Sequence, residues 1–134
     1  MDHDLAEFYR CCFERPGDPQ TALHLARTVS GLGNTRPRGC DDLPTALSVA
    51  VVSNMPLDVI QALVENGSDA ALPSIMGTPM HSACEVGRID AAKLFRDRQP
   101  CSVHTHDPRG RTPVAVARER RYDDLVAFLE RAIS

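Results

Sequence analysis

The sequence predicts an all-α protein in which short paired helices stack side by side. The first observation is a recurring hexapeptide that opens with Thr and closes with Ala. Thr45, Thr78 and Thr112 begin three of its copies, spaced 33 and 34 residues apart, and a period of this size indicates stacked units of supersecondary structure. The second observation is composition. With 43% hydrophobic but only 4% aromatic residues, small side chains between closely packed helices are favoured over a sandwich or barrel.

An N-terminal helix is predicted over residues 4–14. Leu5, Phe8 and Cys12 recur there at helical spacing, and Asp4 precedes them as a cap. Because the end of a stack leaves one flank of the core open, we expect this helix to cover that flank.

Each hexapeptide is expected to start the first helix of a unit. The Thr hydroxyl can accept a hydrogen bond from a backbone N–H that lacks an intrahelical partner, and Pro after Thr loses nothing at the first helical position. The closing Ala is expected where helices approach closely. The four segments are Thr21–Ala26, Thr45–Ala50, Thr78–Ala83 and Thr112–Ala117.

Each first helix should end about nine residues after its Thr. Asn54 and Gly87 suit a left-handed helix end there, whereas Arg121 departs from that pattern. The second helices are then predicted from apolar faces at helical spacing. Their apolar residues are Val59, Ile60, Leu63 and Val64, then Ala91, Ala92, Leu94 and Phe95, then Leu125, Val126, Phe128 and Leu129.

The first unit is the irregular one, because Thr21 and Thr45 are only 24 residues apart. Residues 31–43 stand where a second helix would be expected, and they are rich in Gly, Pro and charge. Such a composition is poor for a helix. The sequence leaves open whether this segment forms a short second element or a loop.

The hexapeptides resemble the opening of the ankyrin repeat, Thr-Pro-Leu-His-x-Ala, and Thr78–Ala83 keeps its Thr, Pro, His and Ala. The resemblance covers roughly residues 20–133. It implies an ankyrin-type helical solenoid with hairpin loops, about three and a half to four repeats and an N-terminal capping helix. The expected parts of this single domain are 1–17 (capping helix), 18–43 (degenerate repeat), 44–76, 77–110 and 111–134 (C-terminal capping repeat). The residues given structural roles are Thr21, His24, Thr45, Asn54, Gly67, Thr78, His81, Gly87, Gly110 and Thr112.

The resemblance implies a non-catalytic module for protein–protein interaction, acting as an adaptor or a competitive inhibitor. A partner protein would lie in the concave groove and against the hairpin tips. The positions that match the family's variable contacts are Asp41, Asp42, Val52, Ser53, Ser74, Ile75, Glu85, Val86, Pro108, Arg109, Arg111, Glu119 and Arg120. This surface is expected to be acidic in the second unit, apolar near Ile75 and Val86, and basic in the last unit.

The Arg residues of the last unit have two interpretations. Arg109, Arg111 and Arg120 could dock an acidic peptide or a phosphate, to which guanidinium groups bind bidentately. Alternatively, they form the solvated polar end that any stack requires. Nucleic acid is not expected, because acidic residues interleave and no aromatic platform accompanies the Arg residues.

A second hypothesis is a metal- or redox-responsive protein on the same scaffold. Cys101, His104 and His106 are metal-ligand types within six residues, although no second ligand pair follows at zinc-finger spacing. Cys84 is interpreted as a small buried hydrophobe rather than a nucleophile. No catalytic residue, metal or cofactor is therefore predicted.

The remaining expectations come from charge and hydropathy. A net charge of −3 gives no basic field for nucleic acid, and no apolar run is long enough for a membrane span. The acidic start Met1–Asp4 lacks the apolar core of a signal peptide. We expect an intracellular, cytoplasmic protein, with the nucleus as the alternative, that is monomeric when free.

Overall fold

The computed structural model describes residues 2–13, 18–29, 31–35 and 44–133. Within these ranges the chain forms eight α-helices, two 3-10 helices and no strand, so the all-α prediction is confirmed. The α-helices are α1 (Asp2–Phe13), α2 (Pro19–Thr28), α3 (Ala46–Val52), α4 (Leu57–Glu65), α5 (Pro79–Val86), α6 (Ile89–Arg98), α7 (Pro113–Glu119) and α8 (Asp123–Ile133), and the 3-10 helices are η1 (Leu32–Asn34) and η2 (Pro100–His104).

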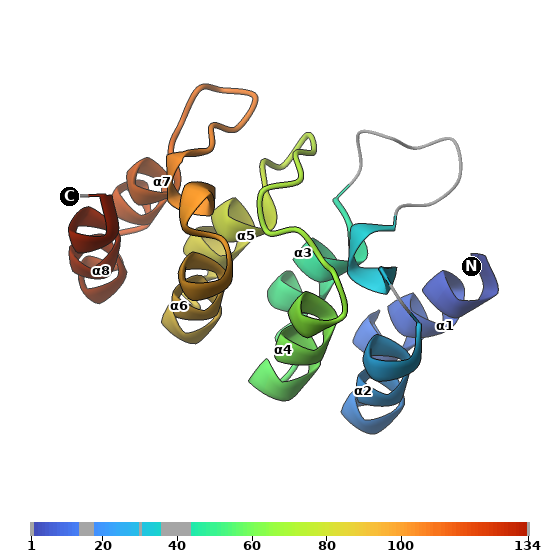
Figure 1. Ribbon diagram of the computed structural model, residues 1–134. Helices are drawn as coiled ribbons and strands as arrows, with labels where there is room; N and C mark the ends of the chain where they lie inside the picture. Colours follow the sequence, from blue (N-terminus) through green and yellow to red (C-terminus); the bar gives the residue numbers. More distant parts are fainter. Residues whose placement is uncertain (1, 14–17, 30, 36–43, 134) are drawn as a thin grey trace.

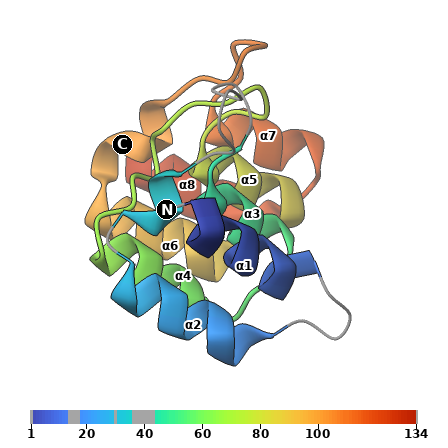
Figure 2. The same cartoon turned by 90° about the vertical axis from the view of Figure 1, so that its right-hand side faces the viewer.

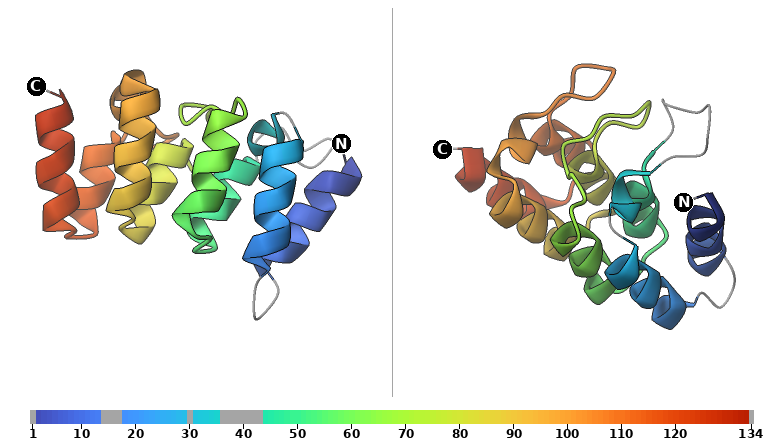
Figure 3. Two further views of the ribbon diagram at one scale, coloured as in Figure 1. Left: turned by 60° about the horizontal axis from the view of Figure 1, so that its bottom comes forward. Right: turned by 45° about the vertical axis from the view of Figure 1, so that its right-hand side comes forward.

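The helices form two rows that run along the stack (Figure 1). Helices α1, α3, α5 and α7 make one row, in which each packs against the next. Helices α2, α4, α6 and α8 make the other row, which stands in front in the left view of Figure 3. The two helices of each pair also contact each other. The N- and C-termini therefore lie at opposite ends of the stack.

Two of the Thr residues cap the first helix of a pair as predicted. The Thr78 hydroxyl accepts a hydrogen bond from the His81 N–H at 3.3 Å, and the His81 Nδ1 accepts one from the Thr78 N–H at 3.2 Å. The Thr112 hydroxyl accepts from the Ala115 N–H at 3.4 Å. Thr45 occupies the same position before α3, but its buried hydroxyl finds no hydrogen-bond partner in the described part of the chain.

The first-row helices α3, α5 and α7 end in the same way. Asn54, Gly87 and Arg121 follow them with φ angles of 64°, 74° and 61°, which is the left-handed conformation expected at a helix end. The next residue in each case donates a hydrogen bond back to the closing Ala of the hexapeptide: Met55 to Ala50 (3.1 Å), Arg88 to Ala83 (2.9 Å) and Tyr122 to Ala117 (3.1 Å). The prediction that Arg121 departs from the pattern is therefore wrong at the level of the backbone.

The assignment of the first hexapeptide is also wrong. Thr21 lies inside the first turn of α2, and the cap is Asp18, whose carboxylate accepts a hydrogen bond from the Thr21 N–H at 3.1 Å. Helix α2 belongs to the second row, while α1 supplies the first-row helix of this pair. His24 is exposed on α2, and no hydrogen bond of its ring is found among the described residues, so its predicted role as a structural tie is wrong.

Two loops, residues 69–78 and 105–112, rise from the same side of the stack (Figures 1 and 2). Gly67 and Gly110 have φ angles of 97° and 78° around these loops, a conformation that glycine adopts without the steric cost of a Cβ. Of the segment 31–43, the described part contains the short helix η1, and residues 36–43 lie outside the described residues.

A continuous apolar core lies between the two rows. It runs from Phe8 of α1 through Leu47 and Ile60 to Phe95 and Leu129, all fully buried. The apolar faces predicted for the second-row helices supply much of it. None of the helices described is long and apolar enough to span a membrane.

Candidate functional site

A groove of about 480 Å³ lies between the two projecting loops, above α5 and α7. Residues of the loop 69–78 line it together with residues of the loop 105–112 and of the ends of α5 and α7. Most of the contact residues predicted in the last two units line it. The lining residues are Ile75, Met76, Glu85, Asp107, Pro108, Arg109, Arg111, Glu119 and Arg120. The sequence missed Met76 and Asp107, although both flank predicted positions.

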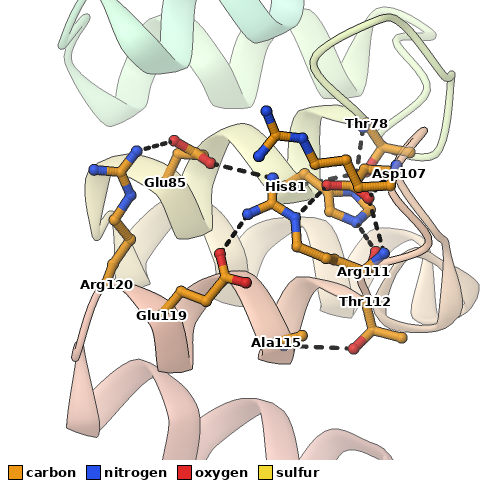
Figure 4. A network of polar contacts seen from close by, with 10 residues as sticks. Thr78, His81, Glu85, Asp107, Arg111, Thr112, Ala115, Glu119 and Arg120 are labelled. Atoms are coloured by element: carbon orange, nitrogen blue, oxygen red, sulfur yellow. Dashed lines mark hydrogen bonds and ion pairs between the residues drawn. The ribbon is translucent and has the colours of Figure 1, made fainter.

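Arg111 is the centre of the polar side of this groove (Figure 4). Its Nε donates to the Asp107 carboxylate at 2.8 Å, and its two terminal nitrogens pair with Glu119 and, at 3.7 Å, with Glu85. The second oxygen of Glu85 accepts from Arg120 at 2.7 Å. The Arg111 guanidinium thus joins the loop 105–112 to α5 and to α7.

The buried side chain of Asp107 holds the backbone of the loop 105–112. Its Oδ1 accepts hydrogen bonds from the backbone N–H groups of Arg109 (3.0 Å) and Arg111 (2.8 Å), and its side chain is only 3% exposed. Burial alone would raise the pKa of this carboxyl group. The backbone N–H and the guanidinium of Arg111 outweigh that effect and hold the pKa below its usual value. Asp107 therefore stays ionised and fixes the turn that carries Arg109.

His81 of α5 contacts the backbone of the same loop through its imidazole ring. Because the Thr78 N–H donates to Nδ1, the proton of the neutral ring is on Nε2, which donates to the Arg111 carbonyl at 2.8 Å. Burial lowers the pKa of His81 and favours this neutral form. These two hydrogen bonds join the start of α5 to the backbone of the second loop.

The charges of the groove differ from the sequence-based expectation of a basic end. Glu85, Asp107 and Glu119 already engage Arg111 and Arg120. The six ionised side chains of the lining therefore sum to zero. The groove as a whole is neutral because Glu85, which comes from α5 of the preceding unit, and Asp107, which is absent from the predicted contact residues, balance the Arg residues.

Arg109 differs from the other two Arg residues of the groove. Its side chain is exposed, and no ion pair to its guanidinium is found among the described residues. Ile75 and Met76, which are each 56% exposed, line the same groove. Large apolar side chains at that exposure, grouped in a depression, indicate a contact surface.

The other predicted contact residues lie outside this lining. Val52 and Val86 are exposed at the ends of α3 and α5. The Ser53 and Ser74 hydroxyls are half-buried and donate to the carbonyl groups of Ala50 and Gly77, so each closes a local turn. Asp41 and Asp42 lie outside the described residues.

A second depression, of about 360 Å³, lies over α2 and α4. In this depression Gln61 donates to Glu65 at 3.1 Å, and Arg98 pairs with Glu65 at 3.1 Å. Among its described lining residues Ala62 is the only aliphatic one, and none is a predicted contact residue. The groove above α5 and α7 is therefore the better candidate.

The residues of the metal hypothesis lie along η2 and the start of the second loop. His104 and His106 are exposed, and the side chain of Cys101 lies outside the described residues. The described side chains include no group of three or more His, Cys, Asp or Glu that could hold a metal ion. Cys84 is fully buried, and burial raises the pKa of its thiol to about 12.

Comparison with models of known protein families finds none that matches this chain.

Proposed function

We propose that the chain is an ankyrin-type repeat protein with a non-catalytic function. It would bind another protein, as an adaptor or a competitive inhibitor. The partner would lie in the groove between the loops 69–78 and 105–112. The fold assignment is supported by the equivalent left-handed helix ends of the last three pairs, at the sequence period of 33 and 34 residues, and by the equivalent Thr caps of the last two pairs.

One observation carries the functional proposal. The groove is built jointly by neighbouring units, and it presents exposed Ile75 and Met76 together with a network of paired charges. In this network Arg111 pairs with carboxylates from its own loop and from α5 and α7. A preorganised surface of this kind loses little conformational entropy when a partner binds.

The chemistry of the groove supports binding rather than catalysis. Its carboxylates and two of its guanidinium groups are committed to one another, so none is held ready as a proton donor or acceptor. Cys84 of α5 is fully buried with a raised pKa, and thiols in such surroundings are poor nucleophiles.

The test uses a photo-crosslinking amino acid placed at single exposed positions of the full chain in its source cells. Ile75 and Pro108 are the groove positions, and Phe13 of α1 and Ala127 of α8 are exposed positions elsewhere. We expect irradiation to join one partner protein to the chain at positions 75 and 108 and not at 13 or 127.

Adducts formed only at positions 13 or 127, or adducts of unrelated abundant proteins at all four positions, would contradict the proposal. Each variant must show the thermal unfolding midpoint of the unmodified chain, so that a missing adduct is not caused by unfolding. The unirradiated sample of each variant is the control for non-covalent association.

A further inference from the structure

The charge distribution of the groove indicates the chemistry of its partner. We infer, resting on the proposed function, that the occupant is a peptide segment with one or two large apolar side chains next to a single carboxylate. Its apolar side chains would contact Ile75 and Met76, and its carboxylate would pair with Arg109.

The apolar half of this inference follows from exposure. Ile75 and Met76 follow one another in the loop, each is 56% exposed, and both line the groove. Removing that surface from water is the largest favourable contribution that the groove can offer. A partner that placed only charged groups there would lose it.

The carboxylate of the inferred peptide follows from which Arg residues of the groove already form ion pairs. Arg111 and Arg120 already have carboxylate partners, so an incoming anion bound to either would lie close to the negative charge of Glu85 or Glu119. Arg109 has no such competitor among the described residues. A carboxylate can therefore reach Arg109 without breaking an existing ion pair.

The same balance argues against a strongly acidic or phosphorylated partner. Since the six ionised side chains of the lining sum to zero, the groove has no net positive charge to attract a polyanion. Each added negative charge beyond the first would lie near Glu85 or Glu119. One exposed ion pair contributes little affinity, so the apolar contact should dominate and the carboxylate should fix the orientation.

The probe is a phage-displayed library of random peptides of about twelve residues, which span up to roughly 40 Å when extended. It is selected on the full chain. Selected peptides are then synthesised with a fluorophore, and their affinity is measured by anisotropy at low and high salt. The variants are Ile75→Ser with Met76→Ser, Arg109→Glu, and the paired change Arg111→Gln with Arg120→Gln. Phe13→Ser, which removes a 62% exposed side chain from α1, is the matched control.

The expected peptides carry an apolar residue and one Asp or Glu. Their affinity for the Ile75/Met76 variant should be at least about tenfold lower than for the unmodified chain. Their affinity for Phe13→Ser should be unchanged. Arg109→Glu should weaken them, and replacing the peptide's acidic residue by Lys should restore binding to Arg109→Glu alone. Affinity should fall by less than about threefold in high salt, because only one exposed ion pair is involved.

Three results would overturn this inference while leaving the proposed function intact. The peptides could be rich in Asp and Glu and lose affinity steeply in salt. They could depend on Arg111 and Arg120 rather than on Ile75 and Met76. They could bind through the apolar residues without responding to the charge exchange at Arg109. If no selected peptide responds to any groove variant, both the inference and the proposed function fail.

Discussion

The Nε2 of His81 donates a hydrogen bond to the backbone carbonyl of Arg111 at 2.8 Å, across the boundary between two helix pairs. The same imidazole accepts from the Thr78 N–H at the start of α5. The side chain of Arg111 in turn holds Asp107, Glu85 and Glu119. One buried histidine therefore fixes the backbone that positions the polar side of the candidate groove (Figure 4).

Stability should depend on pH through His81. Burial lowers the pKa of His81 in the folded chain below its ordinary value of 6.5, with smaller effects from Asp107, Arg111 and His106. Below about pH 6.5 the unfolded chain therefore binds a proton that the folded chain does not, and the free energy of unfolding falls as the pH drops toward the folded pKa. We expect this decrease in urea unfolding experiments between about pH 7.5 and 5.5.

His81→Gln should have a lower free energy of unfolding and a flatter pH dependence in that range, since its side chain does not titrate. His24→Gln, on the exposed face of α2, is the control for the exchange of a His for a Gln. Equal slopes for the unmodified chain and His81→Gln would rule out this role for His81. The carboxyl of Asp107, whose pKa is lowered, should act only in a more acidic range, near and below about pH 4.

The two paired Arg residues of the groove should differ in their effect on folding. Arg111→Gln leaves the Asp107 carboxylate, which is 3% exposed, without its guanidinium partner, and should lower the free energy of unfolding by about 2 kcal/mol. Arg120→Gln breaks a pair in which the Arg side chain is 54% exposed, and should cost at most about 0.5 kcal/mol. Chemical denaturation of both variants tests this order, and an equal cost would contradict it.

Two buried serines should be replaceable with a gain in stability. The hydroxyl groups of Ser68 and Ser102 are buried without a hydrogen-bond partner in the part of the chain that the structure describes. Such a group costs about 1 to 3 kcal/mol of desolvation, so Ser102→Ala should raise the free energy of unfolding by about 1 kcal/mol. Ser74→Ala is the control, because its hydroxyl donates to the Gly77 carbonyl at 2.8 Å. That substitution should be neutral or destabilising, and a loss of stability in Ser102→Ala would show that its hydroxyl has an unseen partner.

Arg121 should be another position at which stability can be gained. It adopts a φ of 61°, while Gly87 takes the same helix-end conformation one unit earlier at 74°. A non-glycine residue pays a steric cost there that glycine does not, so Arg121→Gly should raise the thermal midpoint by a few degrees, or about 0.5 to 1 kcal/mol. Arg118→Gly, inside α7, should lower it. A lower midpoint for Arg121→Gly would mean that the Arg side chain makes a stabilising contact.

The sequence predicted the helix caps and helix ends well, because these depend on the residue type at one position and on backbone groups near it. Thr before a helix, Pro at its first position and Gly or Asn at its end act through backbone groups within a few residues. The caps at Thr78 and Thr112 and the left-handed ends at Asn54 and Gly87 were therefore predictable.

The first pair shows where the same reasoning fails. Residues 21–26 copy the hexapeptide because both kinds of helix need one apolar face, and an apolar face does not reveal the row to which a helix belongs. Asp18 followed by Pro19 was the local signal that the helix starts earlier. Packing of α2 on α4 and of α1 on α3 decides the rows, and that information is spread over distant segments.

The candidate groove divides in the same way. The sequence by itself determined which residues stand at loop tips and helix ends, because the repeat period places them. Only the tertiary structure decided the charge of the groove, since Glu85 and Arg120 are separated by a whole unit in the chain and meet at 2.7 Å. Charge–charge attraction depends on distance in space, and no spacing along the chain reports that distance across a unit boundary.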